Sequence, residues 1–216
     1  MSQLEGKVAI VTGAARGLGR AYAEAMAQEG AAILACDINS CDDTVAAIVA
    51  AGGRAAATVT DISSMASCTA MAEQAVQAFG KIDVLVNNAA LYAGLKGARF
   101  ENLDEAQWDA VMNINVKGLW QSCKAVVGPM REAGGGSIIN IASLAAVYGL
   151  PYGLDYVASK AAVIGMTRGM ARELGQDLIR VNAVAPSAVM TAVSYTHLTL
   201  PTTIPSWGWR GWGEGS

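Results

Sequence analysis

A tyrosine and a lysine four residues apart are the pair of side chains in this sequence best suited to proton transfer. Tyr156 and Lys160 lie in a segment with helical spacing, so both project from one face of the expected helix. A free tyrosine has a pKa of about 10, and a neighbouring ammonium lowers this pKa because it stabilises the phenolate. The spacing predicts that Tyr156 is a general acid and base assisted by Lys160. The alternative is an ordinary surface pair. Tyr152 has no lysine four residues later, and we assign it to packing or substrate contact.

A glycine-rich stretch near the N-terminus has the composition of a phosphate-binding turn. It reads Thr12-Gly13-Ala14-Ala15-Arg16-Gly17-Leu18-Gly19, follows a short apolar run and opens a segment with helical spacing. Glycines permit a tight turn and close approach to a pyrophosphate, and free amides at a helix N-terminus favour negative charge. We therefore assign Gly13, Arg16, Gly17, Leu18 and Gly19 to dinucleotide binding. The alternative is a turn whose glycines serve only close packing.

Acidic residues after the next two apolar runs bear on which dinucleotide binds. Asp37 ends the second run, where a carboxylate can accept hydrogen bonds from the adenosine ribose and repel a 2′-phosphate. Arg16 argues the other way, since a guanidinium can pair with that phosphate. We give Asp37 more weight and expect NAD, with NADP less favoured. Asp61 and Ile62, after the third run, are assigned to the adenine pocket, although Asp61 could instead cap the next helix.

These residues follow a regular series of short apolar runs. Runs rich in β-branched residues predict strands at Val8–Val11, Ala31–Ala35, Ala57–Thr60, Ile82–Val86, Ser137–Ile141 and Ile179–Ala185. Helical spacing predicts helices at Leu18–Glu29, Asp42–Ala51, Met65–Phe79, Leu103–Arg131 and Leu154–Leu174, with Ser63 and Asp104 as caps. The alternation and the near-continuous hydrophobicity of the strands predict an α/β fold, a Rossmann-like doubly wound parallel sheet covered on both faces.

Composition narrows the range of partners. The chain has 216 residues, 53% of them hydrophobic, which fits a single domain over residues 1–192. The net charge is -3 and the sequence has no basic run, which argues against nucleic acid as a partner. It has no long apolar segment either, which argues against a membrane, and we expect a cytoplasmic protein. The four cysteines lack CxxC spacing, so we expect them in the core. His197, the single histidine, has no nearby ligand partners, so we expect no metal site.

Six motifs in order resemble the short-chain dehydrogenase/reductase family over residues 4–192. They are the glycine-rich stretch at 12–19, Asn-Asn-Ala-Ala at 87–90, Asn-Val-Lys-Gly at 115–118, Ser143, Tyr-Val-Ala-Ser-Lys at 156–160 and Asn-Ala-Val-Ala-Pro at 182–186. The resemblance implies NAD-dependent interconversion of a secondary alcohol and its ketone, with a small molecule as substrate. It also implies that Ser143 hydrogen-bonds the substrate oxygen and that Asn115 holds a water linked to Lys160. Asn113 competes for this role, but only Asn115 precedes Val-Lys-Gly.

The resemblance also implies further cofactor contacts. Asn88, Ala89 and Ala90 resemble the stretch that lines the cofactor, with Ala90 in place of the usual glycine; an alanine needs a backbone conformation that its Cβ tolerates. Pro186 and Thr191 match positions that contact the nicotinamide, although Ser187 replaces a glycine.

The segment 193–216 does not resemble the family. It holds three of the five tryptophans and no helix or strand period, and Val193 to Pro201 resembles a translated transposase sequencing adapter. We expect a truncated or chimaeric chain that lacks the last family strand and the substrate lid; a divergent disordered tail is the alternative. An intact family member would form a homodimer or homotetramer through the helices at 103–131 and 154–174. Two other functions stay open: a catalytically silent NAD-binding module, and an NADP-dependent oxoacyl reductase.

Overall fold

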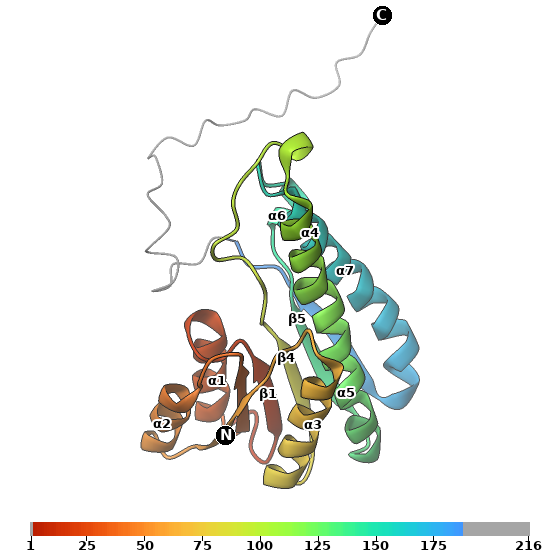
Figure 1. Cartoon of the computed structure of the whole chain (residues 1–216). Helices are drawn as coiled ribbons and strands as arrows, with labels where there is room; N and C mark the ends of the chain where they lie inside the picture. The colour runs from red at the N-terminus through yellow and green to blue at the C-terminus, as the bar shows by residue number, and fades with distance from the viewer. Residues whose placement is uncertain (1, 188–216) are drawn as a thin grey trace, which may run out of the picture.

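The computed structural model describes residues 2–187, which form a single α/β unit around one parallel sheet (Figure 1). The strands are β1 (Val8–Thr12), β2 (Ala32–Asp37), β3 (Arg54–Val59), β4 (Val84–Asn87), β5 (Gly136–Ile141) and β6 (Ile179–Val184). Their order across the sheet is β3-β2-β1-β4-β5-β6, and every neighbouring pair is parallel. This confirms the predicted doubly wound fold. The third strand begins at Arg54, three residues before the predicted start at Ala57, because Ala55 and Ala56 also pair with β2.

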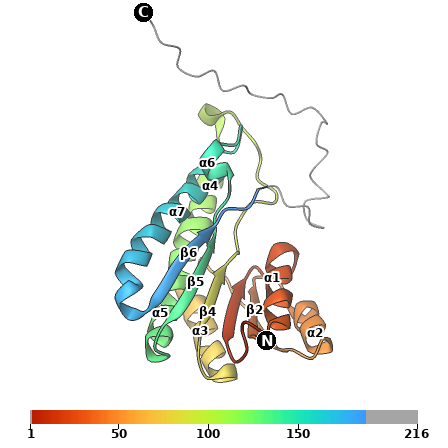
Figure 2. The same ribbon diagram turned by 180° about the vertical axis from the view of Figure 1, so that it is seen from behind.

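Helices cover the sheet from both sides (Figures 1 and 2). Helices α1 (Gly17–Gln28) and α2 (Asp42–Ala50) pack on one face. Helices α3 (Met65–Phe79), α5 (Leu119–Glu132) and α7 (Leu154–Leu174) pack on the other. The largest fully buried side chains include Ile10, Ile33 and Leu85 from the central strands, whose burial excludes water from both faces.

The expectation that every strand is covered on both faces is wrong for β6. Among the described residues β6 is an edge strand, and Arg180, Asn182 and Val184 are exposed while Ile179 and Val181 are buried. Alternation of this kind is typical of a strand with one covered face. Thr191 and segment 193–216, with His197, lie outside the described residues.

The predicted helix Leu103–Arg131 is interrupted. A short turn η1 (Phe100–Asn102) precedes α4 (Glu105–Met112), which continues through a π-helical turn η2 (Asn113–Gly118) into α5. Helical periodicity in the sequence does not reveal the extra residue per turn. A wide turn of this kind is frequent at functional sites, and this one directs Asn115 into the interior, where it is 2% exposed. A four-residue helix α6 (Ala145–Tyr148) was not predicted either.

Two helix starts are capped by side chains. Asp104 accepts from the backbone N–H of Gln107 at 3.3 Å, which confirms this predicted cap of α4. The prediction for α3 is wrong by one residue: Ser64 accepts from Ser67 N–H at 3.4 Å. Ser63 instead donates from its hydroxyl and its backbone N–H to Asp61 Oδ1.

The strand order places the candidate residues along one edge of the sheet. The chain crosses to the opposite side of β1 after β3, so β1 and β4 become neighbours. Ligands of doubly wound sheets bind at the carboxyl ends of the strands beside such a switch point. The candidate residues that follow the six strands, or end them, are Gly13, Asp37, Asp61, Asn88, Ser143 and Pro186. No helix among residues 2–187 is both long enough and apolar enough to cross a membrane.

Candidate active site

The glycine-rich turn joins β1 to α1 with a backbone that requires glycine. Gly13 and Gly17 have positive φ angles of 68° and 60°. A Cβ on Gly19 would collide with the carbonyl oxygen of Gly13 and lie 2.6 Å from Asn88 Nδ2. In the described part of the chain, no side chain caps α1 at Arg16 and its first turn has no acidic residue. The turn therefore presents uncapped amides where the backbone at Gly13 and Gly19 packs too closely for a Cβ, and such amides fit a dinucleotide pyrophosphate.

The Asp37 carboxylate lies against this turn. Its Oδ2 accepts from Ala15 N–H at 3.2 Å, and its Oδ1 accepts from the backbone and side-chain amides of Asn39 at 2.9 and 3.0 Å. Arg16, on the same turn, is exposed. The structure thus brings Asp37 beside the candidate phosphate site, while Arg16 on the same turn is exposed.

Residues after β4 close the other side of the turn. Asn88 donates from Nδ2 to the carbonyls of Thr12 and Gly13 at 3.0 and 3.2 Å, and the backbone N–H groups of Asn88 and Ala89 both donate to Thr12 Oγ1 at 3.1 Å. Ala90 is exposed and does not have a positive φ, so a residue with a Cβ fits its backbone. These hydrogen bonds therefore connect the ends of β1 and β4 beneath the turn.

Asp61 and Ile62 follow β3 but differ in exposure. Asp61 is exposed, and its Oδ1 accepts hydrogen bonds from the backbone N–H and the hydroxyl of Ser63, so it does not cap α3. Ile62 is buried and packs against Gly118, where a Cβ would meet its Cδ1 at 3.0 Å. Pro186 accepts from Leu144 N–H at 3.0 Å, next to Ser143, while Ser187 is exposed.

The structure brings Ser143 and Tyr156 together from different elements. Ser143 lies between β5 and α6, where its hydroxyl accepts from Ala145 N–H at 3.1 Å, and Tyr156 lies in the first turn of α7. Burial raises the pKa of Tyr156, and a hydrogen bond with Ser143 acts in the opposite direction. The protein's own groups do not give the lowering of this pKa that we expect from Lys160 together with an oxidised nicotinamide. The reason is that desolvation of the phenolate dominates at this position.

Lys160 is anchored below the tyrosine. It is 4% exposed, and its Nζ donates to the Ile141 carbonyl at 2.7 Å and lies 5.8 Å from the centroid of the Tyr156 ring. Burial lowers the pKa of this ammonium to about 8. Lys160 is thus near Tyr156, but its nearest partner is the backbone at the end of β5.

Asn115 is buried, whereas its register competitor Asn113 is exposed. Asn115 Oδ1 accepts from Leu91 N–H at 2.7 Å, and its Nδ2 donates to Leu91 O and Ser159 Oγ, both at 3.1 Å. Within the described residues no hydrogen bond joins Asn115 to Lys160. Its side chain therefore fixes the segment after β4 and contacts α7 one residue before the lysine.

Tyr92 is a residue that the sequence did not single out. Its ring centroid lies 4.7 Å from that of Tyr156, with the planes tilted by 50°. The only signal in the sequence was its position two residues after the Asn-Asn-Ala-Ala motif, and nothing local indicates a contact with a residue so far along the chain.

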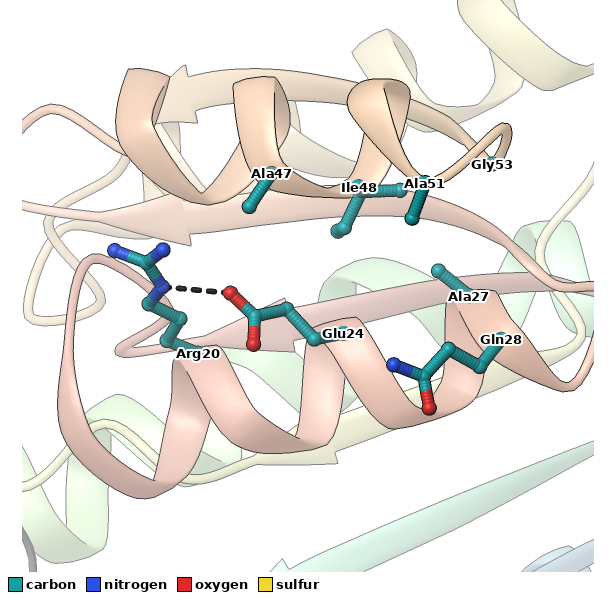
Figure 3. A pocket seen from close by; sticks show the side chains of 8 residues that line it. All are labelled: Arg20, Glu24, Ala27, Gln28, Ala47, Ile48, Ala51 and Gly53. Carbon is teal, nitrogen blue, oxygen red and sulfur yellow. Dashed lines mark hydrogen bonds and ion pairs between the residues drawn. The ribbon is translucent and has the colours of Figure 1, made fainter.

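A groove between α1 and α2 is separate from these residues (Figure 3). Its volume is about 330 Å³, and Arg20, Glu24 and Gln28 line it opposite Ile48. Arg20 and Glu24 pair with each other at 2.7 Å. None of the residues assigned to catalysis or cofactor binding lines this groove.

Within residues 2–187, no group of three or more His, Cys, Asp or Glu side chains could hold a metal ion, and all four cysteines are buried and free.

A dinucleotide cradle at the switch point of a parallel sheet, beside a Ser-Tyr-Lys cluster, defines a nicotinamide-dependent oxidoreductase. The family model of the short chain dehydrogenases matches residues 7–198. The chain belongs to this family, and it is an oxidoreductase that uses NAD(P) and acts on CH–OH groups.

Relatives in the family differ in their substrates. The chain is 41% identical to the 3-oxoacyl-[acyl-carrier-protein] reductase FabG of Thermotoga maritima, over 89% of this chain and 78% of the relative. It is 40% identical to D-threitol dehydrogenase of Mycolicibacterium smegmatis, over 89% and 74%. The crystal structure of carveol dehydrogenase from Mycobacterium avium in complex with NAD superposes with a TM-score of 0.82 at 32% identity, over 86% of this chain and 72% of that one.

Proposed function

We propose that this protein interconverts a secondary alcohol and its ketone with NAD as cofactor, and that Tyr156 is the general acid and base. The observation that carries the proposal is the convergence of Ser143, Tyr156 and Lys160 at the same edge of the sheet as a turn that requires glycine at positions 13, 17 and 19. Bound NAD supplies the hydride acceptor at its nicotinamide ring.

Tyr156 moves the proton. As alcohol is oxidised, its phenolate Oη takes the hydroxyl proton while hydride leaves the carbinol carbon, and in ketone reduction Oη returns the proton to the substrate oxygen. Ser143 Oγ donates a hydrogen bond to this oxygen and stabilises the charge that develops there. Because burial raises the Tyr156 pKa, the phenolate depends on the positive charge of Lys160 5.8 Å from its ring. Asn115 acts as a positioning residue for α7 through Ser159.

The preference for NAD rests on Asp37. Its carboxylate is held at the turn by Ala15 N–H, where it would accept from ribose hydroxyls and repel a 2′-phosphate. The other residues proposed to contact the dinucleotide are Gly13, Arg16, Gly17, Leu18, Gly19, Asp61, Ile62, Asn88, Ala89, Ala90, Pro186 and Thr191, together with Tyr156 and Lys160.

A second candidate is an NADP-dependent oxoacyl reductase. The observations in its favour are the exposed Arg16 on the turn and the 41% identity to a 3-oxoacyl-[acyl-carrier-protein] reductase. Steady-state rates with NADH and NADPH, on a simple ketone and on acetoacetyl-CoA, separate the two. A kcat/KM at least tenfold higher for NADPH with the thioester, by our choice of threshold, would favour the second candidate.

The change Tyr156→Phe tests the chemistry. General acid–base catalysis contributes about 10²- to 10⁴-fold, so we expect kcat for alcohol oxidation to fall by this factor while NAD affinity is kept. Tyr22→Phe, on α1 and not among the residues assigned to catalysis or cofactor binding, is the control and should leave both the activity and the NAD affinity unchanged. Retained activity in Tyr156→Phe would refute the assignment. Binding of NAD by the wild type without turnover of any alcohol would indicate the silent module.

We also propose that the family domain ends near residue 192 and that 193–216 is foreign to it, on the basis of its composition. The match to the family model ends six residues later, at residue 198. Resequencing the source gene across codons 190–205 tests this; an uninterrupted natural reading frame would refute it. A cytoplasmic location and assembly as a homodimer or homotetramer through the segments 103–131 and 154–174 remain predictions. Light scattering of the purified protein checks the assembly.

A further inference from the structure

We infer that the substrate of this site is an uncharged secondary alcohol, or the corresponding ketone, that carries an aromatic or alicyclic ring next to the carbinol carbon. The inference rests on the proposed function and names its substrate class. It assigns to Tyr92 the contact with this ring. It draws on three features of the described residues: the position of Tyr92, its support by Asn115, and the uncharged surface around Tyr156.

Tyr92 stands beside the reacting position. Its ring lies 4.7 Å from the Tyr156 ring at a tilt of 50°, yet 58% of the residue stays exposed. A substrate oxygen bonded to Tyr156 and Ser143 would place the carbinol carbon and its substituents close to this ring. Aromatic faces bind flat apolar groups in tilted or offset arrangements.

The backbone that carries Tyr92 is held in place. Both the N–H and the carbonyl of Leu91 are bonded to the buried Asn115 amide, at 2.7 and 3.1 Å. A tyrosine has few rotatable bonds, so a fixed backbone leaves its ring largely ordered. An ordered Tyr92 ring loses little conformational entropy when it contacts a ligand, which favours affinity for a rigid ring in the substrate.

Two segments without any charged residue border the pair. Residues 89–95 follow β4, and residues 144–154 connect Ser143 to α7. Their exposed large hydrophobic residues are Tyr92, Val147, Tyr148, Leu150, Tyr152 and Leu154. Ala98 N–H donates to Tyr152 O at 3.1 Å, so the chain beyond residue 95 runs beside the second segment. Both segments belong to the end of the molecule that holds α6 and the start of α7 (Figures 1 and 2).

The charges nearest in sequence are engaged elsewhere or lie outside these segments. Asp155 is 1% exposed and accepts from Gln107 Nε2 at 2.8 Å. Arg99 pairs with Glu101 at 3.1 Å, and Lys96 and Arg99 both lie beyond residue 95. A surface whose exposed side chains are mostly aliphatic and aromatic disfavours a polyol, whose hydroxyls would lose water and gain few partners.

Kinetics with three alcohols and NAD test the inference. We expect kcat/KM of the wild type to decrease from 1-phenylethanol to 2-butanol to threitol. Tyr92→Ala should lower kcat/KM for 1-phenylethanol by about tenfold, mainly through KM, and leave 2-butanol within about threefold. Tyr92→Phe keeps the ring and should retain the wild-type preference. Val49→Ala removes an exposed apolar side chain on α2 and is the matched control.

Two outcomes would overturn the inference. One is a higher kcat/KM of the wild type for threitol than for 1-phenylethanol, and the other is an equal decrease in kcat/KM for 1-phenylethanol and 2-butanol in Tyr92→Ala. Failure of the proposed function is a separate result, seen when the wild type oxidises none of the alcohols. In that case, saturation-transfer NMR of acetophenone binding tests the role of Tyr92 without any need for turnover. A signal lost in Tyr92→Ala and kept in Val49→Ala supports it, and equal signals in all three proteins refute it.

Discussion

The glycine-rich turn and the catalytic cluster lie at the same edge of the sheet but are built in different ways. The turn consists of eight consecutive residues, 12–19, and its shape follows from two positive φ angles and one close contact between Gly13 and Gly19. The cluster draws Asn115 from η2, Ser143 from beyond β5 and Lys160 from α7. Its geometry depends on hydrogen bonds between residues far apart in the sequence.

This difference predicts two kinds of sensitivity. A change in the turn should act on cofactor binding through local backbone geometry. A change in the cluster, or in the network beneath it, should act through the position of α7. Asn140 illustrates the second kind, because it is fully buried and bonded to Asn87 on β4 and to Thr167 on α7, both at 2.9 Å. The next residue, Ile141, accepts the bond from Lys160.

The largest expected effect is that of Gly19→Ala. The new Cβ would collide with the Gly13 carbonyl, and a backbone atom cannot yield as a flexible side chain does. We expect NAD affinity to fall by about 100-fold or more, as calorimetric titration would measure.

Gly169→Ala is the matched control for this change, because Gly169 lies in α7 with open space where a Cβ would be. An alanine there should stabilise the helix by up to about 1 kcal/mol and leave NAD affinity unchanged. If the affinity of Gly19→Ala stayed within threefold of the wild type, by our choice of threshold, the cradle assigned to the turn would be wrong.

Lys160→Met should change the pH dependence of stability. Burial lowers the Lys160 pKa from 10.5 to about 8. Between these values the unfolded chain binds more protons than the folded one, so this lysine makes the free energy of unfolding rise with pH from about 8 to 10.5. Below pH 8 the folded protein carries the full cost of the buried charge, on the order of 3 kcal/mol.

Urea unfolding of wild type and Lys160→Met from pH 7 to 10 measures this effect. The difference in unfolding free energy between the two proteins removes the contribution of the titrating groups that they share. Relative to the variant, the wild type should become more stable as the pH rises above 8. A difference that stayed constant across this range would show that Lys160 keeps an ordinary pKa.

The smallest expected effect is that of Asn140→Ala. It leaves the Asn87 amide and the Thr167 hydroxyl with fewer partners in the core, which costs about 1–3 kcal/mol of unfolding free energy. Asn182→Ala is the control, because Asn182 is exposed on the neighbouring strand and pairs in register with Ile139. Equal stability of both variants in thermal unfolding would mean that the buried network does not hold the cluster.

The sequence alone determined what depends on short stretches of chain. It predicted the parallel α/β sheet, the bounds of α3 and α7, the cap at Asp104 and the glycine turn, because hydrophobic period, capping chemistry and backbone freedom are local properties. It also placed Tyr156 and Lys160 on one helix face, since a spacing of four residues defines that face.

Only the tertiary structure decided the rest. Periodicity could not separate Asn113 from Asn115, because the π-helical turn that buries Asn115 forms against Leu91 and Ser159. It could not show that Tyr92 meets Tyr156, a contact between distant segments. Nor could it give the direction of the Tyr156 pKa, since burial raises this pKa while the hydrogen bond with Ser143 lowers it, and their balance depends on how deeply the folded chain covers the ring.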